Sequence, residues 1–385
     1  MRINKSGFLA VTMVAGVLCA GGQALEPRAN VSLKLEVKRA VDRGAKFLLD
    51  HQDEAGFWSD KDHPALTALA LTALHGHPSG KYRSKPTAGM RQGYGYILAT
   101  QKADGGFYVE GYANYNTAVS MMGLLTAGLA EFDTPLKTAR SYLVGLQNDL
   151  GEKGKMDTPF DGGVGYGRRY PHSDLNNTLL ALEAIHHTRH LVADAGNVGT
   201  DLDWGAAISF LQNCQNLPAF NKGTNVASDV ANLGGFHYYP GHSQAGAVTN
   251  SLTGKVSLRS YGSASYAGLL SYIYADLKHD DPRVKSVMAW LGNNYTLEEN
   301  PGMGQQGLFY YFHLITKAMT AAKVGKLAGK NGRLIDWRRE VAQRILNLQQ
   351  GDGSWANKNN RWWETDSVLV TSYCMMALEL IYPEL

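Results

Sequence analysis

The chain has 385 residues, of which 44% are hydrophobic and 18% charged, and its formal net charge is +3. This composition is typical of a folded globular protein with enough apolar residues for a large core. A charge this close to balance excludes the strongly basic surface by which nucleic-acid-binding proteins attract their partners, so no nucleic acid is expected as a ligand.

Residues 1–24 predict a secretory signal peptide. Two basic residues, Arg2 and Lys5, precede the apolar run FLAVTMVAGVLCA, and small residues follow at Gly22 and Ala24. The run is shorter than the roughly 20 apolar residues that a transmembrane helix needs. We therefore expect cleavage after Ala24, export to the periplasm or the exterior, and no integral membrane span in the mature chain.

Two cysteines, Cys214 and Cys374, remain after this cleavage. A single pair does not make a disulfide framework, although an exported pair can form a bond. Both residues lie in apolar helical runs, which favours two buried free thiols.

After a short linker at residues 25–32, one helix–turn–helix unit recurs six times and forms a single domain over residues 33–385. In each unit an amphipathic run at helical period, such as AVDRGAKFLLDHQ, precedes a run that is apolar nearly all round, such as HPALTALALTAL. The first pattern is typical of a helix with one face in water, and the second of a fully buried helix. The units lie near residues 38–75, 89–127, 136–190, 203–277, 281–322 and 336–381.

A Gln-x3-Gly-x-aromatic turn links the two helices in three of these units. It begins at Gln52 in HQDEAGFW, at Gln101 in TQKADGGF and at Gln349 in LQQGDGSW. Glycine permits a tight turn, and the Gln amide can satisfy backbone groups that are left free at helix ends. Looser copies follow Gln147 and Gln215, and the fifth unit lacks the Gln. We interpret these turns as structural.

Six such pairs predict an all-α fold, an α6/α6 toroid in which the inner helices form a barrel and the outer helices face water. All inner helices then start at one end, where their N-termini converge on one mouth. Because each N-terminus carries about half a positive charge, the mouth is expected to favour an anionic or carbonyl-rich ligand. Two long connections on this side, residues 148–172 and 216–260, are expected to act as lids or binding loops.

The Gln-x3-Gly-x-Trp turns between paired helices resemble the QW-type repeats of squalene and oxidosqualene cyclases, and the predicted ring resembles that of protein prenyltransferase β-subunits. The resemblance covers nearly the whole mature chain. It implies a terpenoid-cyclase-like toroid that holds a hydrophobic isoprenoid-type molecule in a central cavity. Because the same ring hosts unrelated activities, the function depends on the site residues.

The resemblance to class II cyclases implies a catalytic acid at the start of an inner helix. In that family the middle Asp of an Asp-x-Asp-Asp motif, which stands directly before a Thr, protonates an alkene. The matching stretch here reads DLNNT at residues 174–178, with Asn176 and Asn177 in place of the two inner acids. An amide cannot deliver that proton, so whether the chain is an enzyme stays open.

The resemblance to prenyltransferases implies a zinc site built from an Asp-x-Cys pair and a His. The chain has no Asp-x-Cys pair, since Ser372 and Tyr373 precede Cys374. No cofactor and no metal are therefore predicted.

Polar and aromatic residues that follow the turns are the candidates for the mouth of the cavity. Many are also preferred helix caps, because Ser, Asp and Asn accept hydrogen bonds from the first helical turn. If the chain is catalytic, Asp174 or His172 is expected to act as acid or base. The expected ligand-binding residues are Asn176, Asn177, Arg169, Asn116, Tyr261, Tyr266, Tyr310 and Asp366.

Two other functions stay open on the sequence alone. One is a polysaccharide lyase-like toroid with an oligosaccharide ligand, which needs a carboxylate-neutralising group and an acid or base. Residues of those types are Asn177, Arg169, His172, Tyr261 and Tyr266. The other is a non-enzymatic binding or scaffold toroid. A closed aromatic and aliphatic cavity would favour an isoprenoid ligand. An open groove lined by Arg, Asn and Tyr would favour a polysaccharide, and a filled cavity would favour a scaffold.

Overall fold

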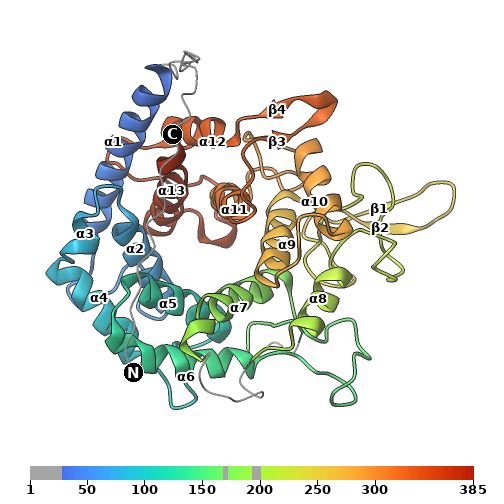
Figure 1. Cartoon of the computed structure of the whole chain (residues 1–385), viewed down its shortest axis with the longest axis horizontal. Helices are drawn as coiled ribbons and strands as arrows, with labels where there is room; N and C mark the ends of the chain where they lie inside the picture. The colour runs from blue at the N-terminus through green and yellow to red at the C-terminus, as the bar shows by residue number, and fades with distance from the viewer. Residues whose placement is uncertain (1–27, 168–171, 193–200) are drawn as a thin grey trace, which may run out of the picture.

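The computed structural model describes residues 28–167, 172–192 and 201–385 (Figure 1). The predicted signal peptide and Arg169 lie outside the described residues. The first helix, α1 (Arg28–Asp50), begins inside the segment that the sequence suggested as a linker, which corrects that boundary. Its buried residues Leu33, Val37, Val41, Ala45 and Leu48 recur every three to four positions, so one continuous amphipathic stripe holds this segment helical.

Two concentric rings of helices make up the described part of the chain (Figure 1). The outer ring consists of α1, α4 (Ala88–Ala99), α6 (Asp133–Val144), α8 (Trp204–Asn213), α10 (Pro282–Asn293) and α12 (Trp337–Leu348). The inner ring consists of α2 (Pro64–Gly76), α5 (Ala113–Ala127), α7 (Leu175–His187), α9 (Gly262–Tyr274), α11 (Leu308–Ala321) and α13 (Ser367–Ile381). A short α3 (Lys81–Ser84) follows α2.

The inner helices pack in chain order, and the last of them closes onto the first. Each inner helix contacts the next one along the chain, and α13 contacts α2. The outer α1 also packs against α12 and α13, so the first and last units share one seam. The all-α toroid of six helix pairs that the sequence predicted is therefore confirmed.

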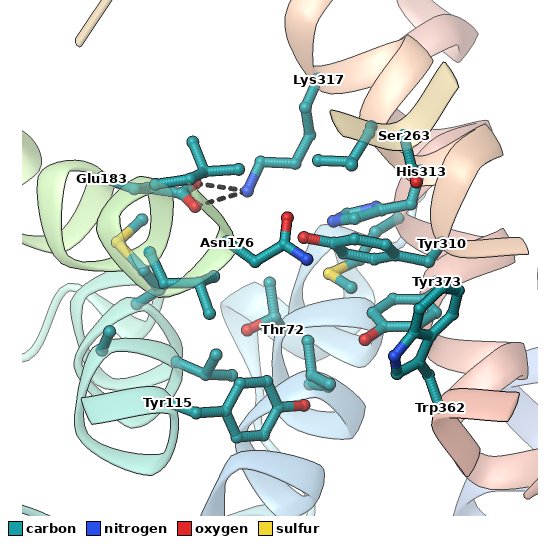
Figure 2. A pocket seen from close by; sticks show the side chains of 18 of the residues that line it. Thr72, Tyr115, Asn176, Glu183, Ser263, Tyr310, His313, Lys317, Trp362 and Tyr373 are labelled. Atoms are coloured by element: carbon teal, nitrogen blue, oxygen red, sulfur yellow. Dashed lines mark hydrogen bonds and ion pairs between the residues drawn. The ribbon is translucent and has the colours of Figure 1, made fainter. Parts of the chain in front are cut away.

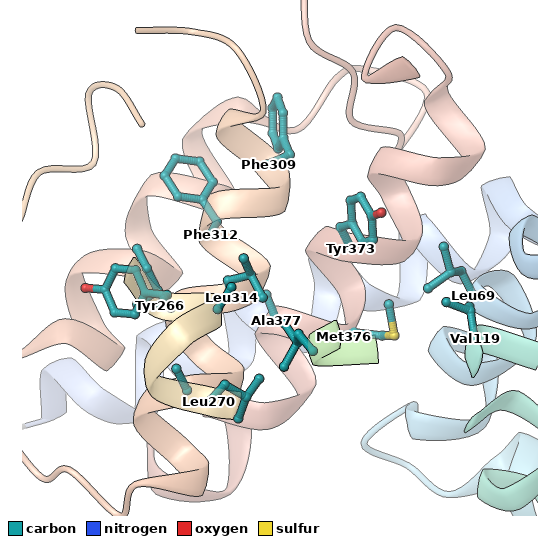
Figure 3. Close-up of a cluster of buried hydrophobic side chains, with 14 of the residues drawn as sticks. Leu69, Val119, Tyr266, Leu270, Phe309, Phe312, Leu314, Tyr373, Met376 and Ala377 are labelled. Carbon is teal, nitrogen blue, oxygen red and sulfur yellow. The ribbon is translucent and has the colours of Figure 1, made fainter. Parts of the chain in front are cut away.

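The inner helices are buried on almost every side, as their apolar sequences require. In α13, residues from Val368 to Leu378 are buried without a break. Figure 3 shows such side chains from neighbouring inner helices packing together, among them Leu270, Phe312 and Ala377. Cys214 and Cys374 are both buried free thiols, as expected. None of the helices in the described ranges is long and apolar enough to cross a membrane.

Each repeated Gln ties its own turn to the next outer helix. The side-chain amide of Gln52 donates to the carbonyl of Gly56 in its turn at 2.9 Å and to the carbonyl of Gly89 in α4 at 2.8 Å. The same two-way bridge is made by Gln101 to Gly105 and Pro135, Gln147 to Gly162 and Asp203, Gln215 to Gly234 and Arg283, and Gln349 to Gly353 and Ala40. One amide thus stabilises both a turn and the seam between two units.

Glycine is required in these turns for two reasons. Gly105 has a φ of 97°, which is left-handed backbone, and a Cβ there would lie 2.6 Å from the Thr138 carbonyl oxygen in α6. The residue two positions after each of these glycines donates its backbone N–H to a hydroxyl at the start of the inner helix. In the first unit, Trp58 donates to the Thr67 hydroxyl at 3.0 Å. Equivalent pairs are Phe107 with Thr117, Val164 with Thr178, Phe236 with Ser265, and Trp355 with Thr371.

The long connection at residues 216–260 carries an antiparallel hairpin of β1 (Ala247–Thr249) and β2 (Val256–Leu258), in register Val248 to Ser257. It extends outwards from the ring beside α10 (Figure 1). A second small hairpin, β3 (Leu327–Ala328) with β4 (Leu334–Ile335), leads into α12.

We predict that Gln349→Ala destabilises the ring by about 2 kcal/mol, because two amide–carbonyl hydrogen bonds at the closing seam are lost at about 1 kcal/mol each. Urea denaturation measures this change. The exposed neighbour offers a matched control, Gln350→Ala, expected within about 0.5 kcal/mol of wild type. Equal stabilities for the two variants would show that the amide does not hold the seam.

Candidate functional site

A cavity of about 910 Å³ lies inside the inner barrel (Figure 2). Side chains from all six inner helices line it, together with loop residues at the end where those helices begin. We call the end near the helix N-termini the mouth half, and the other end the C-terminal half. A volume of this size lies within the range of small-molecule sites, so the barrel interior is not filled by its own side chains.

Tyrosines and tryptophans dominate the mouth half. Burial raises the pKa of Tyr115 to about 12, so its phenol stays neutral. The electron-rich ring faces of such residues attract cationic character. The aromatic residues that line the cavity near its mouth are Tyr112, Tyr115, Tyr166, Tyr238, Tyr261, Tyr310, Tyr373, Trp362 and Trp363.

Three of these aromatic residues have strained backbone. Tyr112, Trp362 and Trp363 have φ values of 41°, 54° and 62°, a region that bulky side chains rarely adopt. Such residues cost about 1–3 kcal/mol each and persist only where their surroundings impose them. Next to the two tryptophans, the buried carboxylate of Glu364 accepts the backbone N–H of Tyr310 at 2.7 Å. The rings of Tyr112 and Trp363 contact each other edge to face, with their centroids 6.0 Å apart.

Asp174 is the N-cap of α7, and both of its carboxylate oxygens accept hydrogen bonds from Asn177. Its Oδ1 accepts the backbone N–H of Asn177 at 2.9 Å, and its Oδ2 accepts the Asn177 side-chain amide at 2.7 Å. The side chain is fully buried behind the cavity wall. Burial raises the pKa of Asp174 to about 6, and the hydrogen bonds from Asn177 partly oppose that rise.

The two amides of the DLNNT stretch differ in their surroundings. Asn177 belongs to a buried network, because the Asn114 amide donates to its carbonyl oxygen at 2.9 Å and to its Oδ1 at 3.1 Å. Asn176 is half-buried and directs its amide into the cavity, where Tyr310 also points (Figure 2). Of the residues expected to bind ligand, Asn176, Asn177, Tyr261 and Tyr310 line the cavity.

Four other expected site residues do not line the cavity, which corrects their placement. Asn116 accepts the backbone N–H of Ala65 at 3.3 Å and so serves the first turn of α2. Asp366 caps α13 by accepting the N–H of Val368 at 2.8 Å. The remaining two are Tyr266, which is buried in the core 5.6 Å from the ring of Tyr311, and His172, which packs 4.7 Å from the ring of Tyr239. These side chains therefore cap helices or pack against neighbouring rings.

The C-terminal half contains an ion pair that the sequence reasoning missed. Lys317 on α11 places its Nζ 2.5 Å from Glu183 Oε1 and 2.6 Å from Oε2, with Glu183 on α7 (Figure 2). The Tyr274 hydroxyl donates to Glu183 Oε1 at 3.2 Å. Each is a single charged residue within an apolar run, LLALEAI and HLITKAM, and this interruption was the available signal.

Two further titratable groups line this part of the cavity. His313 is buried and stacks on Tyr373 with ring centroids 5.2 Å apart, and its Nδ1 has no hydrogen-bond partner in the described structure. Burial lowers the pKa of His313 well below its ordinary value, so the ring is neutral at pH 7. Burial likewise raises the pKa of Glu379 well above its usual range, which favours the neutral carboxyl. Among the described residues, no three His, Cys, Asp or Glu side chains gather as a metal ion would require.

We predict that Asp174→Asn changes how stability depends on pH. The folded-state pKa of about 6 lies above the unfolded value of about 4, so protonation of Asp174 favours the fold. This contribution is full below about pH 4 and is lost as the pH rises through 6. Wild type should therefore lose about 2–3 kcal/mol relative to the variant between pH 4 and 7.

Urea denaturation of wild type and Asp174→Asn between pH 4 and 7 measures the difference in their free energies of unfolding. The contributions of the other carboxyl groups are common to both proteins and cancel in this difference. A matched control is Asp203→Asn, which replaces the N-cap of α8 at an exposed helix start. A difference between wild type and Asp174→Asn that stays constant with pH would contradict the prediction.

No protein-family model matches the sequence. Among solved structures, the chain is similar to several of the type II terpene cyclase MstE from Scytonema. An apo variant of that enzyme has a TM-score of 0.56 at 12% identity, over 92% of this chain and 99% of the other. A complex with geranylgeranyl dihydroxybenzoate has a TM-score of 0.54 at 11% identity, over 92% and 100%. A complex with merosterolic acid A has a TM-score of 0.52 at 13% identity, over 92% and 99%. Identities this low show a shared fold, which is that of a terpenoid-cyclase-like toroid.

Proposed function

We propose that this chain is an exported, terpenoid-cyclase-like toroid that binds a hydrophobic isoprenoid-type molecule in its central cavity. The observation that carries the proposal is the cavity itself, about 910 Å³ within a barrel of apolar helices. Leucines, methionines, tyrosines and tryptophans form most of its wall, for example Leu69, Tyr310, Met376 and Trp362. A wall of this kind favours a long apolar ligand, since burial contributes about 25 cal/mol per Å² of apolar surface.

The fold neighbours support the same ligand class. The MstE structures include complexes with geranylgeranyl dihydroxybenzoate, described as the substrate, and with merosterolic acid A, described as the product. Nearly the whole of those chains aligns with this one. A ring of the same fold with an aromatic cavity is therefore a reasonable host for an isoprenoid here.

The wall of the cavity favours an isoprenoid over the alternatives that the sequence left open. A polysaccharide-binding groove would be open and lined by Arg, Asn and Tyr. The cavity has tyrosines and two asparagines, but Arg361 is its one lining arginine among the described residues, and leucines, methionines and tryptophans make up much of the wall. A scaffold toroid would have a filled interior, whereas this interior is hollow.

Catalysis by protonation of an alkene would need an acid that faces the ligand. Asn176, at the position of the family's acid, faces the cavity but has no acidic proton. Asp174 accepts hydrogen bonds from Asn177 with both oxygens, whereas Glu379 lines the cavity as a carboxyl whose pKa is raised by burial. The proposal is therefore ligand binding, and Glu379→Gln and Asp174→Asn are the two variants that would test any turnover observed.

Export is part of the proposal and rests on the N-terminal sequence. N-terminal sequencing of the protein from its host should begin at Leu25, directly after the predicted cleavage site.

We predict that native mass spectrometry of the protein from its host detects a retained apolar ligand. Val119→Trp should reduce this retention at least tenfold, because a larger side chain from α5 occupies the chamber. Leu334→Trp is the matched control, since it adds the same ring at an exposed position outside the cavity. Ligand-free wild-type protein, or equal retention by both variants, would count against an isoprenoid in the chamber.

A further inference from the structure

We propose that the ligand is an uncharged isoprenoid alcohol whose hydroxyl lies between His313 and the Glu183–Lys317 ion pair, with its hydrocarbon chain directed toward the mouth. This inference rests on the proposed function and adds to it the polar group of the ligand and its orientation. The contacts of three side chains carry the argument: Glu183 on α7, and His313 and Lys317 on α11.

The ion pair extends across the interior of the barrel. The inner ring runs from α7 through α9 to α11, so Glu183 and Lys317 come from helices that are separated by a third. Both residues line the cavity, and Figure 2 shows them meeting inside it rather than within a helix–helix interface. His313 lies one helical turn before Lys317, which places both on the same face of α11. A ligand in the C-terminal half therefore meets all three groups together.

The hydrogen-bonding capacity left over at this place suits a hydroxyl. The Lys317 ammonium has three N–H donors, and the contacts with Glu183 account for two of them. The neutral His313 ring also lines the cavity; its Nδ1 is enclosed, which leaves Nε2 as the ring nitrogen that can face a ligand as an acceptor. An alcohol can donate its O–H to His313 and accept the third N–H of Lys317, and buried polar groups that stay unpaired are costly.

Charge balance disfavours an anionic group in the same place. Glu183 already neutralises Lys317. The inner helices end on this side, and each C-terminus carries about half a negative charge. Glu379, also in the C-terminal half, would be forced further toward its neutral form by an anion nearby. A diphosphate would thus bring two or more negative charges to a site where the Lys317 ammonium is already paired with Glu183. Burying such unpaired charge is costly.

The rest of the cavity fits the hydrocarbon chain. The 13 residues of α7 and α9 give a barrel about 20 Å long, at 1.5 Å per residue. Above the ion pair the wall consists of aliphatic side chains such as Leu180, Leu314 and Met376, and then of the aromatic residues of the mouth. The chain of an alcohol held at His313 would lie against this apolar surface, with its far end under the strained tryptophans.

Calorimetric titration with farnesol, farnesene and farnesyl diphosphate tests the proposal on the mature chain. Farnesol should bind at least tenfold more tightly than either of the others, since one well-placed hydrogen bond to a buried group corresponds to about a factor of ten. His313→Phe keeps a ring that can stack on Tyr373 and removes both ring nitrogens. It should weaken farnesol about tenfold and change farnesene less than twofold.

The double variant Glu183→Met with Lys317→Met removes both charges together, so that neither is left buried and unpaired. It should abolish the preference for farnesol and strengthen farnesene. Met376→Leu is the control on the same wall, and it should shift both affinities by the same factor because it removes no polar atom.

The outcomes separate this inference from the proposed function. Tighter binding of the diphosphate, or equal binding of farnesol and farnesene, would overturn the hydroxyl site and leave isoprenoid binding intact. An equal loss of both ligands in His313→Phe would show that the ring only shapes the wall, which also overturns it. Failure of all three ligands to bind would overturn the proposed function together with this inference.

Discussion

The Gln amide that joins each turn to the next outer helix is the interaction on which the rest of the ring depends. It fixes the seam between two units and also stabilises the turn itself. The end of that turn is bound in its own right to the inner helix, where the Trp58 N–H donates to the Thr67 hydroxyl. In the fifth unit, which lacks the Gln, Arg344 of α12 donates instead to the Leu297 carbonyl at 3.1 Å. Because every inner helix starts from such a turn, the polar residues that follow gather at one mouth.

The same construction explains why polar residues at the mouth are poor evidence of a site. Each inner helix begins in a buried place with backbone N–H groups that need acceptors. Asp174, Asp366 and Asn116 provide them, which the fold requires whatever the chain does. Asn176, two residues after the capping Asp174, is not needed as a cap and reaches the cavity.

The sequence predicted the fold well because a repeat specifies it six times over, through turn residues whose backbone geometry few other residues can adopt. The mouth of the site was predicted in part: Asn176, Asn177, Tyr261 and Tyr310 line the cavity, but Tyr266 packs into the core on the same helix start as Tyr261. A helix that is apolar all round gives no periodicity to separate the face on the cavity from the face on a neighbour. For that reason Glu183, His313 and Lys317 went unrecognised, although each interrupts an apolar run.

Several features that cost stability border the cavity. Left-handed backbone at Trp362 and Trp363, a mostly buried ion pair and a histidine with an unpartnered nitrogen all border the same space. Packing alone would favour apolar side chains for Glu183 and Lys317, since hydrophobic replacements of a buried ion pair are often neutral or stabilising. Left-handed backbone and unpartnered buried polar atoms occur elsewhere too, for example at Asp276 and Tyr94. Those at the chamber differ in facing a space large enough for a ligand, and a ligand can satisfy polar groups that the fold leaves open.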